Sequence, residues 1–309
     1  MLHVDIETHR EMYDNYKLGI EYLKTVDDKD FEYPDEVTNF HIYSEVKNVK
    51  ELECVRSFFA TQNLEKTKLI LWSQYPIEDH PELKPFKDHI DFRVWDALEE
   101  AKGTPLEGET GKLLTKDAEH YADSDLLRLL ALHKYGGVWV DMDIVILRDF
   151  KPILDQEYMY QWGTETDYGK NGACATVISL KKGSEFSVKL LEELKLSKNA
   201  HGTWWGKELF ASLWSKWPNY KIFPGSFFNT EWMMDKYAEL YNEDFGLYNK
   251  VTSSWFSNPL ESHEHLFLDA FTWHWHNTSH KKDPIVSGSK FDILRDMNTD
   301  SLIDRGFSV

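Results

Sequence analysis

Short apolar runs alternate with amphipathic stretches along the first half of the chain. Runs typical of buried strands lie at Phe40–Tyr43, Leu69–Trp72 and Phe92–Trp95. The stretch 48–61 carries apolar residues at helical spacing on one face. Strands that alternate with helices favour a parallel sheet covered by helices. The pattern therefore predicts an α/β fold.

A second series of elements follows residues 103–117, which are rich in Gly, Thr and Lys and which we interpret as a loop. We predict a helix from about Asp117 to Tyr135, stopped by Gly136, and then a strand at Val138–Val140 that continues as an apolar run to Leu147. Further elements are predicted as a strand at Thr176–Leu180, a helix at Phe186–Leu196 and a helix within 201–217. The aromatic and histidine-rich stretch from Val251 to His280 shows no clear period.

The first 38 residues are acidic and rich in tyrosine. Tyr16, Ile20 and Leu23 recur at helical spacing, and the acidic run at 27–30 ends the pattern. We predict a helical extension over 1–38 that packs on the main domain. A mobile acidic arm is the alternative.

Composition limits the possible functions. The chain has 309 residues, of which 41% are hydrophobic, so it can bury a sizeable core. A net charge of −18 argues against nucleic acid and against anionic membranes as partners. No signal peptide or run of about 20 apolar residues is visible, so we expect no membrane span and a cytoplasmic location. The two cysteines fit a reducing compartment, although one long-range disulfide is possible.

Two acidic residues interrupt the apolar run that follows Gly136-Gly137. The segment reads Tyr-Gly-Gly-Val-Trp-Val-Asp-Met-Asp, which places Asp141 and Asp143 two residues apart. In an extended strand both carboxylates would point the same way, and burying two adjacent anions is costly. A divalent cation offsets that cost, and carboxylate oxygens suit Mg²⁺ or Mn²⁺. We predict a site for a metal and a diphosphate here; a strand end with two solvated aspartates is the alternative.

The preceding helix contains Asp125 and Arg128, three residues apart and therefore on one side. An arginine in this place could bind a phosphate through two hydrogen bonds, and the aspartate could orient it or bind sugar hydroxyls. By themselves the two residues could equally form an ordinary ion pair within the helix. Their position directly before the glycine pair favours the functional interpretation.

These motifs together resemble a known family. Ser-Asp-Leu-Leu-Arg followed by Tyr-Gly-Gly-Val-Trp-Val-Asp-Met-Asp is similar to the Asp-x-Asp sugar transferases of glycosyltransferase family 32, and to the catalytic block of the clostridial glucosylating toxins. Gly103-Thr104-Pro105-Leu106 also resembles a segment of the α-1,4 enzymes in that family. The strong similarity covers about Thr104 to Phe150.

The resemblance implies a GT-A fold, which is a mixed, mostly parallel sheet flanked by helices around a Rossmann-like nucleotide-sugar-binding core. It implies one catalytic domain at 39–309, with a donor half at about 39–150 and an acceptor half at about 151–309. It also implies Mn²⁺ or Mg²⁺, a nucleotide-sugar donor (UDP-sugar favoured over GDP-mannose) and transfer with retention at the anomeric carbon. A glycan, lipid or protein hydroxyl would be the acceptor.

Residue roles follow by position. Asp141 would contact the metal and the donor, Asp143 would bind the metal, and Arg128 and Asp125 would contact the donor phosphate or sugar. A further metal ligand is expected near the C-terminus, where His276 or His274 is the candidate and aromatic core packing is the alternative.

Ser279 would contact the donor, although His280 stands where many family members have tryptophan. His41 and Tyr43 lie where such enzymes hold the nucleoside. Small residues at 171–173 would leave room for the sugar. Trp204, Trp205 and Glu208 could shape an acceptor site, with core packing as the alternative for the tryptophans.

Two other functions remain open. A different metal-dependent phosphoryl enzyme would need more clustered acidic ligands and often two metals. A non-enzymatic module that binds carbohydrate or a partner through its aromatic residues would not need Asp141, Asp143 and Arg128 together.

Overall fold

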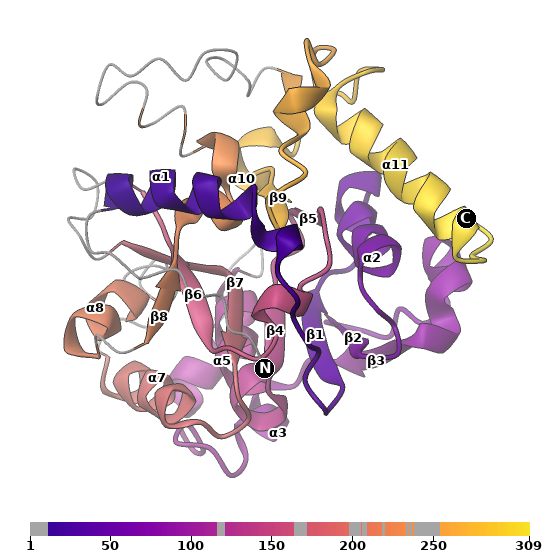
Figure 1. Cartoon of the computed structure of the whole chain (residues 1–309). Helices are drawn as coiled ribbons and strands as arrows, with labels where there is room; N and C mark the ends of the chain where they lie inside the picture. Colours follow the sequence, from indigo (N-terminus) through magenta and orange to yellow (C-terminus); the bar gives the residue numbers. More distant parts are fainter. Residues whose placement is uncertain are drawn as a thin grey trace.

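A mixed sheet forms the centre of the molecule in the computed structural model (Figure 1). The structure describes residues 12–115, 121–163, 172–197, 209–217, 220–232 and 254–309, together with Trp205, Met234 and Tyr237. The seven strands lie in the order β3 (Ile90–Val94), β2 (Thr67–Ser73), β1 (Thr38–Tyr43), β4 (Gly137–Val140), β7 (Ala173–Leu180), β6 (Tyr158–Gln161) and β8 (Lys221–Phe223).

Most neighbouring strands in this sheet are parallel. β3, β2, β1 and β4 all run in one direction, and β6 pairs in parallel with β8. β7 is antiparallel to both of its neighbours, β4 and β6. The α/β class and the mostly parallel sheet predicted from the sequence are confirmed.

Alternating side chains along the strands bury both faces of the sheet. Phe40 and Ile42 of β1 enter one core cluster, whereas Tyr43 enters the other. The first face packs against α2 (Val49–Thr61), with α11 (Lys290–Asp304) outside it. The second face is covered by α3 (Ala97–Ala101), α5 (Tyr121–Tyr135), α7 (Glu185–Leu196) and α8 (Leu209–Lys216). The helices predicted at 48–61, 186–196 and within 201–217 are therefore confirmed.

The apolar run predicted to continue to Leu147 belongs to two sheets. β4 ends at Val140, and β5 (Ile144–Ile146) pairs instead with β9 (Thr272–His274) in a small antiparallel sheet. The aromatic stretch that showed no period supplies β9, the short helix α10 (Asn277–His280) and a third core cluster that includes Trp255 and Trp275. This pairing brings the C-terminal part of the chain to the Asp-x-Asp.

The N-terminal segment contains the predicted helix. α1 (Met12–Leu23) is followed by a 3₁₀ turn, η1 (Val26–Asp28), and packs against η6 (Gly225–Phe227) (Figure 1). Tyr16 is buried in this contact. The described part of this segment therefore matches the packed helix and not the alternative of a mobile arm.

The segment 103–117, interpreted as a loop, differs from that interpretation by one helical turn, α4 (Thr110–Leu113). The start predicted for the next helix near Asp117 lies outside the described residues, and α5 is described from Tyr121. Short 3₁₀ helices complete the fold at η2 (Pro81–His89), η3 (Lys151–Ile153) and η9 (His263–Leu266).

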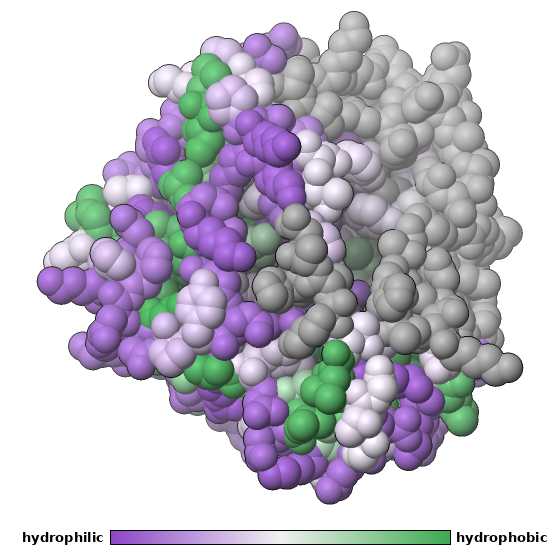
Figure 2. Space-filling model, turned by 180° about the vertical axis from the view of Figure 1, so that it is seen from behind, coloured by the Kyte–Doolittle hydropathy of each residue, from purple (hydrophilic) through white to green (hydrophobic). Residues whose placement is uncertain are grey.

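The surface is mainly polar. Figure 2 shows hydrophilic residues over most of the described face, with apolar residues in narrow patches. None of the described helices combines the length and the apolar character needed to cross a bilayer. Both cysteines are buried and free.

Candidate active site around the Asp-x-Asp turn

Two glycines make the sharp connection from α5 into β4. Gly136 and Gly137 have φ values of +67° and +108°, a region that side chains other than glycine rarely adopt. A Cβ atom on Gly137 would lie 2.1 Å from the carbonyl oxygen of Asn39 in β1. The Gly-Gly pair therefore lets β4 enter the sheet directly beside β1.

Asp141 and Asp143 lie in a tight turn at the end of β4, and not in the extended chain in which their carboxylates were expected to point the same way. The Ile144 amide donates to the Asp141 carbonyl over 3.1 Å, which closes the turn between β4 and β5. The Asp141 amide donates to the Thr176 carbonyl of β7 over 2.8 Å. The turn lies at the carboxyl end of β4, the edge where α/β sheets bind ligands.

Arg128 connects the two candidate donor-binding aspartates. Its Nη2 donates to Asp141 Oδ1 over 2.8 Å and lies 3.2 Å from Asp125 Oδ1. The indole of Trp139 donates to the same Asp141 oxygen. The Arg128 side chain is only 6% exposed, so its positive charge is buried beside Asp141. The structure thus brings together Asp125, Arg128 and Asp141 as predicted.

Electrostatics differ between the two carboxylates of the turn. Burial raises the pKa of Asp141 above its ordinary value, although the Arg128 charge opposes this effect. Burial would also raise the pKa of Asp143, but His274 and the amide of Asn277 outweigh it and hold this pKa at about 2. Asp143 is therefore the firmly ionised member of the pair.

The C-terminal segment supplies the partners of Asp143. The Asn277 amide donates to Asp143 Oδ2 over 2.8 Å, and His274 Nε2 lies 3.2 Å from the same oxygen. The Trp275 amide donates to the Asp143 carbonyl over 3.1 Å. β9 and the start of α10 therefore fix both the backbone and the side chain of Asp143.

His276 does not point at the aspartates. Its Nε2 lies 3.1 Å from Asn229 Oδ1, and its ring stacks on His274 with centroids 3.8 Å apart. Burial, and then the neighbouring His274, lower its pKa well below the ordinary value. Within the described parts of the chain, no group of three or more His, Cys, Asp or Glu residues is arranged to hold a metal ion. The predicted set of Asp141, Asp143 and His276 is therefore not assembled.

The two aspartates themselves fit a divalent cation. Asp141 uses Oδ1, and Asp143 uses Oδ2, for the hydrogen bonds just described. Among the residues that the structure describes, none forms a hydrogen bond with the other oxygen of either carboxylate, and the two side chains remain 19% and 15% exposed. Each residue thus offers one hard oxygen, and a metal bound there would keep open positions for phosphate oxygens.

The two residues predicted to contact the nucleoside, His41 and Tyr43, lie in different surroundings. His41 is fully buried; its Nε2 lies 3.0 Å from the Gly136 carbonyl, and its Nδ1 accepts from Trp72. Its ring therefore has no polar atom left for a ligand. Tyr43 ends β1 at the same sheet edge as Asp141, and its hydroxyl contacts Gln74.

The sequence analysis missed a polar cluster beside Tyr43. Asp123 is 1% exposed and accepts from the Trp95 indole over 2.9 Å and from Gln74 Nε2 over 3.0 Å. Gln74 and Trp95 directly follow β2 and β3, so their approach to Tyr43 depends on strand order. The signal available in the sequence was Gln74, a polar residue shortly after the strand predicted at Leu69–Trp72.

The remaining site residues predicted from the sequence are spread over different parts of the chain. Ser279 is exposed, and its amide donates to the His276 carbonyl over 2.9 Å. Trp205 is 1% exposed in the core, which is the packing alternative stated for it. Gly172 and Ala173 lead into β7, whereas residues 171, 204 and 208 lie outside the described part of the chain.

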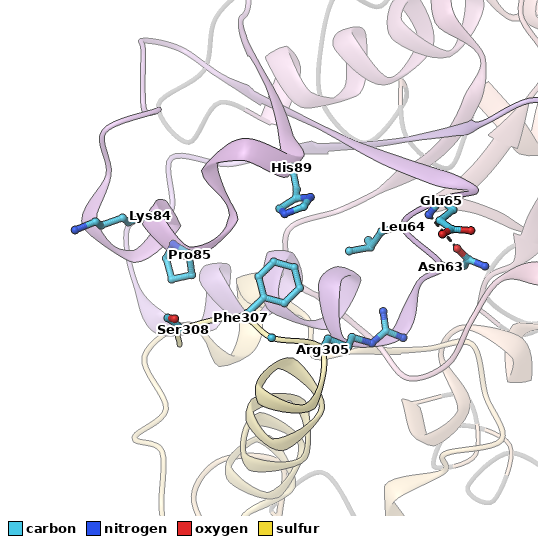
Figure 3. A pocket seen from close by; sticks show the side chains of 10 residues that line it. Asn63, Leu64, Glu65, Lys84, Pro85, His89, Arg305, Phe307 and Ser308 are labelled. Carbon is cyan, nitrogen blue, oxygen red and sulfur yellow. Dashed lines mark hydrogen bonds between the residues drawn. The ribbon is translucent and has the colours of Figure 1, made fainter.

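A separate groove of about 910 Å³ lies on another part of the molecule (Figure 3). Residues 63–65 before β2, the 3₁₀ helix η2 and the C-terminal residues Arg305–Ser308 line it. Phe307 packs there against His89, with ring centroids 5.5 Å apart. No residue of the Asp-x-Asp turn lines this groove.

Comparison with known families supports the assignment of the turn. Residues 48–160 match the family model described as "Glycosyltransferase sugar-binding region containing DXD motif". This region contains α2, the Asp125–Arg128 pair and the Asp-x-Asp turn. The predicted resemblance to Asp-x-Asp glycosyltransferases is confirmed for this part of the chain. No curated protein sequence matches the chain significantly.

A solved structure shows a similar fold, and two further structures align more weakly. The apo-form glycosyltransferase GlyE of Streptococcus pneumoniae TIGR4 aligns with a TM-score of 0.51 and 11% identity over 87% of this chain, and the chain spans 62% of that protein. PaToxG glycosyltransferase gives 0.44 and 14% identity, covering 94% and 96% of the two chains. Mouse xyloside xylosyltransferase 1 gives 0.45 and 12% identity, covering 81% and 100%. The fold is that of GT-A glycosyltransferases.

Proposed function

We propose that this chain, whose residues 48–160 form a glycosyltransferase region of the Asp-x-Asp type, is a metal-dependent retaining glycosyltransferase that uses a nucleotide sugar, with UDP-sugars favoured. The observation that carries the proposal is the Asp-x-Asp turn itself. It presents two carboxylates, each with one oxygen that no described residue binds, at a ligand-binding sheet edge beside a buried arginine.

The donor diphosphate is proposed to lie against this turn. A bound Mn²⁺ or Mg²⁺ supplies Lewis-acid stabilisation of the departing diphosphate. Asp143 is suited to hold the cation because it stays ionised far below neutral pH. Asp141 is suited to share it through its free oxygen, while its other oxygen stays bonded to Arg128.

Arg128 and Asp125 are proposed to act on the sugar and phosphate side of the donor. Arg128 places a fixed positive charge next to the turn, which favours a developing anion without reorganisation of the protein. Asp125 remains 18% exposed and can accept hydrogen bonds from sugar hydroxyls. Tyr43 with Gln74 and Asp123 is proposed to face the nucleoside, since this cluster lies at the ends of β1 and β2.

Retention of configuration is proposed from the resemblance and not from a single residue. The resemblance to retaining transferases suggests attack of the acceptor from the same face as the departing diphosphate. Holding donor and acceptor in this geometry would then supply much of the rate. A glycan, lipid or protein hydroxyl is the proposed acceptor.

Slow hydrolysis of the donor in the absence of an acceptor tests the proposal. We expect one nucleotide sugar from a panel to be hydrolysed in the presence of Mn²⁺, and EDTA to stop the reaction. Nuclear magnetic resonance of the released sugar then reports its anomeric configuration. Failure of every nucleotide sugar to bind or react, with and without Mn²⁺, would overturn the proposal.

Asp143→Asn tests the site. The substitution removes the ionised ligand, and we expect the hydrolysis rate to fall at least about 100-fold while the circular dichroism spectrum is unchanged. Asp91→Asn is the matched control, because Asp91 lies on β3 outside the turn and pairs with Lys68 of β2 and with Arg93. Full turnover by Asp143→Asn would show that the metal site has been assigned to the wrong residues.

A further inference from the structure

His276 has a strained backbone that fixes the position of a hydrogen-bond donor to Asp143. Its φ is +52°, a left-handed conformation that is uncommon and unfavourable for a residue other than glycine. The next residue, Asn277, donates its amide to Asp143 Oδ2. The left-handed conformation of His276 therefore leads directly into the bond that holds the Asp143 carboxylate.

Packing on both sides holds the His276 ring in place. His274 stacks on one face at 3.8 Å, and Trp232 lies 4.2 Å away between ring centroids. The ring also pairs with Asn229, which is 2% exposed. Asn229 and Trp232 both belong to the segment 225–232, so the strained residue depends on where this segment lies.

Helix α1 holds the segment 225–232 from one side. The Tyr16 hydroxyl donates to the Thr230 carbonyl over 2.7 Å, and the Ser226 hydroxyl donates to the Tyr16 carbonyl over 3.0 Å. Gly19 permits this close approach, since a Cβ atom there would lie 2.2 Å from Ser226 Oγ and 2.6 Å from Pro224 Cβ. Figure 1 shows α1 lying across the edge of the molecule beside this part of the chain.

Helix α11 holds the same segment from another side. Glu231 pairs with Lys290 at the start of α11, and their side chains are 2% and 0% exposed. α1 also reaches β6, where Asn15 donates to Gln161 Oε1 over 2.7 Å, next to Trp162. The Trp162 ring lies 5.5 Å from that of His276. Two helices distant in sequence thus enclose the surroundings of His276.

We propose that helix α1 is a positioning element of the active site, which acts through the segment 225–232 and the strained residue His276 to hold the Asp143 carboxylate. This inference rests on the proposed function for its effect on turnover. His276 serves in it as a positioning residue and not as a metal ligand.

Gly19→Ala gives a test in which the sign of the effect is informative. Alanine is more favourable than glycine within a helix, so an α1 that packed against nothing would gain stability. We expect the opposite here, because the new methyl group separates α1 from Ser226 and Pro224. Hydrogen–deuterium exchange of peptides covering 272–280 should accelerate at least 3-fold in the metal-free protein. Gly111→Ala in α4 is the matched control, because nothing lies within 4 Å of the added atom.

Tyr16→Phe tests the same connection without added bulk. It removes the hydroxyl that bonds to Thr230 and should also accelerate exchange at 272–280. Tyr22→Phe on the same helix is its control, because that hydroxyl accepts from Lys29. For turnover, we expect kcat to fall 3- to 10-fold in Tyr16→Phe with little change in KM for the donor.

His276→Asn separates positioning from metal ligation. Asparagine tolerates the left-handed conformation, so exchange at 272–280 should stay slow. Loss of an imidazole ligand would instead remove the nitrogen coupling of that ring from the electron spin echo spectrum of bound Mn²⁺, and would lower the preference for Mn²⁺ over Mg²⁺. Loss of this nitrogen coupling or a lowered preference for Mn²⁺ in His276→Asn would overturn the inference. Unchanged exchange at 272–280 in both Gly19→Ala and Tyr16→Phe would also overturn it. Altered exchange in a protein that hydrolyses no nucleotide sugar would leave it standing and reject the proposed function.

Discussion

At the scale of single residues, burial decides which side chains are available for ligands. His41 and Asp143 are both ionisable and both lie near the carboxyl ends of strands. His41 has both ring nitrogens bonded within the protein, whereas no described residue binds the second carboxylate oxygen of Asp143. The sequence placed both in the donor site, because hydrophobic pattern does not show which polar atoms are already satisfied.

His41 should make the stability of the protein depend on pH. Burial lowers its pKa from 6.5 to about 4, so between these values the unfolded chain binds more protons than the folded protein. Stability from this residue is complete above pH 6.5 and is lost as pH falls towards 4, by about 3 kcal/mol. Urea unfolding of the wild type and of His41→Gln between pH 4 and 7 measures the effect. Parallel pH profiles for the two proteins would contradict it.

At the scale of elements, the sequence predicted most of what lies between residues 40 and 150. Strands β1 to β4 and helix α2 follow from the apolar period, and the Asp125–Arg128 pair follows from helical spacing. The turn at Asp141–Asp143 could not be predicted, because the apolar run continues on both sides of it. β9 was missed since its partner β5 lies 128 residues earlier, measured between the paired residues Val145 and Trp273. Pairing over such a separation leaves no local period in the sequence.

The α5–β4 connection should tolerate no side chain at Gly137. Alanine there meets the Asn39 carbonyl in a backbone region unfavourable to it, and we expect a loss of more than about 2 kcal/mol in the free energy of unfolding. Urea denaturation measures the loss. Gly183→Ala, with φ of +61° and open space around it, should cost about 1 kcal/mol. Equal losses for the two variants would show that backbone conformation alone, and not contact with β1, requires glycine.

At the scale of the whole molecule, the net negative charge of the chain opposes the approach of the proposed donor. The chain carries a net charge of −18, yet the proposed donor is itself an anion. Within the described residues the structure meets this conflict locally, with a buried arginine beside the turn and two carboxylates suited to a cation. The long-range field remains repulsive, and salt should weaken that repulsion.

Salt should therefore stabilise the fold. Raising NaCl from about 0.01 M to about 0.15 M shortens the Debye length from about 30 Å to about 8 Å and screens repulsion between the excess acidic residues. We expect a gain of about 1 kcal/mol, or roughly 2 °C in Tm by differential scanning calorimetry. KCl should act equally, because the effect is not specific to an ion. A Tm that falls over this range would mean that attractive ion pairs outweigh the net charge.

The pairing of β5 with β9 has a consequence for the order in which the residues around Asp143 are synthesised. Ile144 lies beside His274, so the turn that carries Asp143 is completed by residues translated 130 positions later. A nascent chain that has left the ribosome as far as Leu260 holds both aspartates without His274 and without the Asn277 amide. If the proposed function holds, such a chain lacks two of the groups that position Asp143, and we expect it to bind the proposed cation and donor less well than the chain that includes β9 and α10.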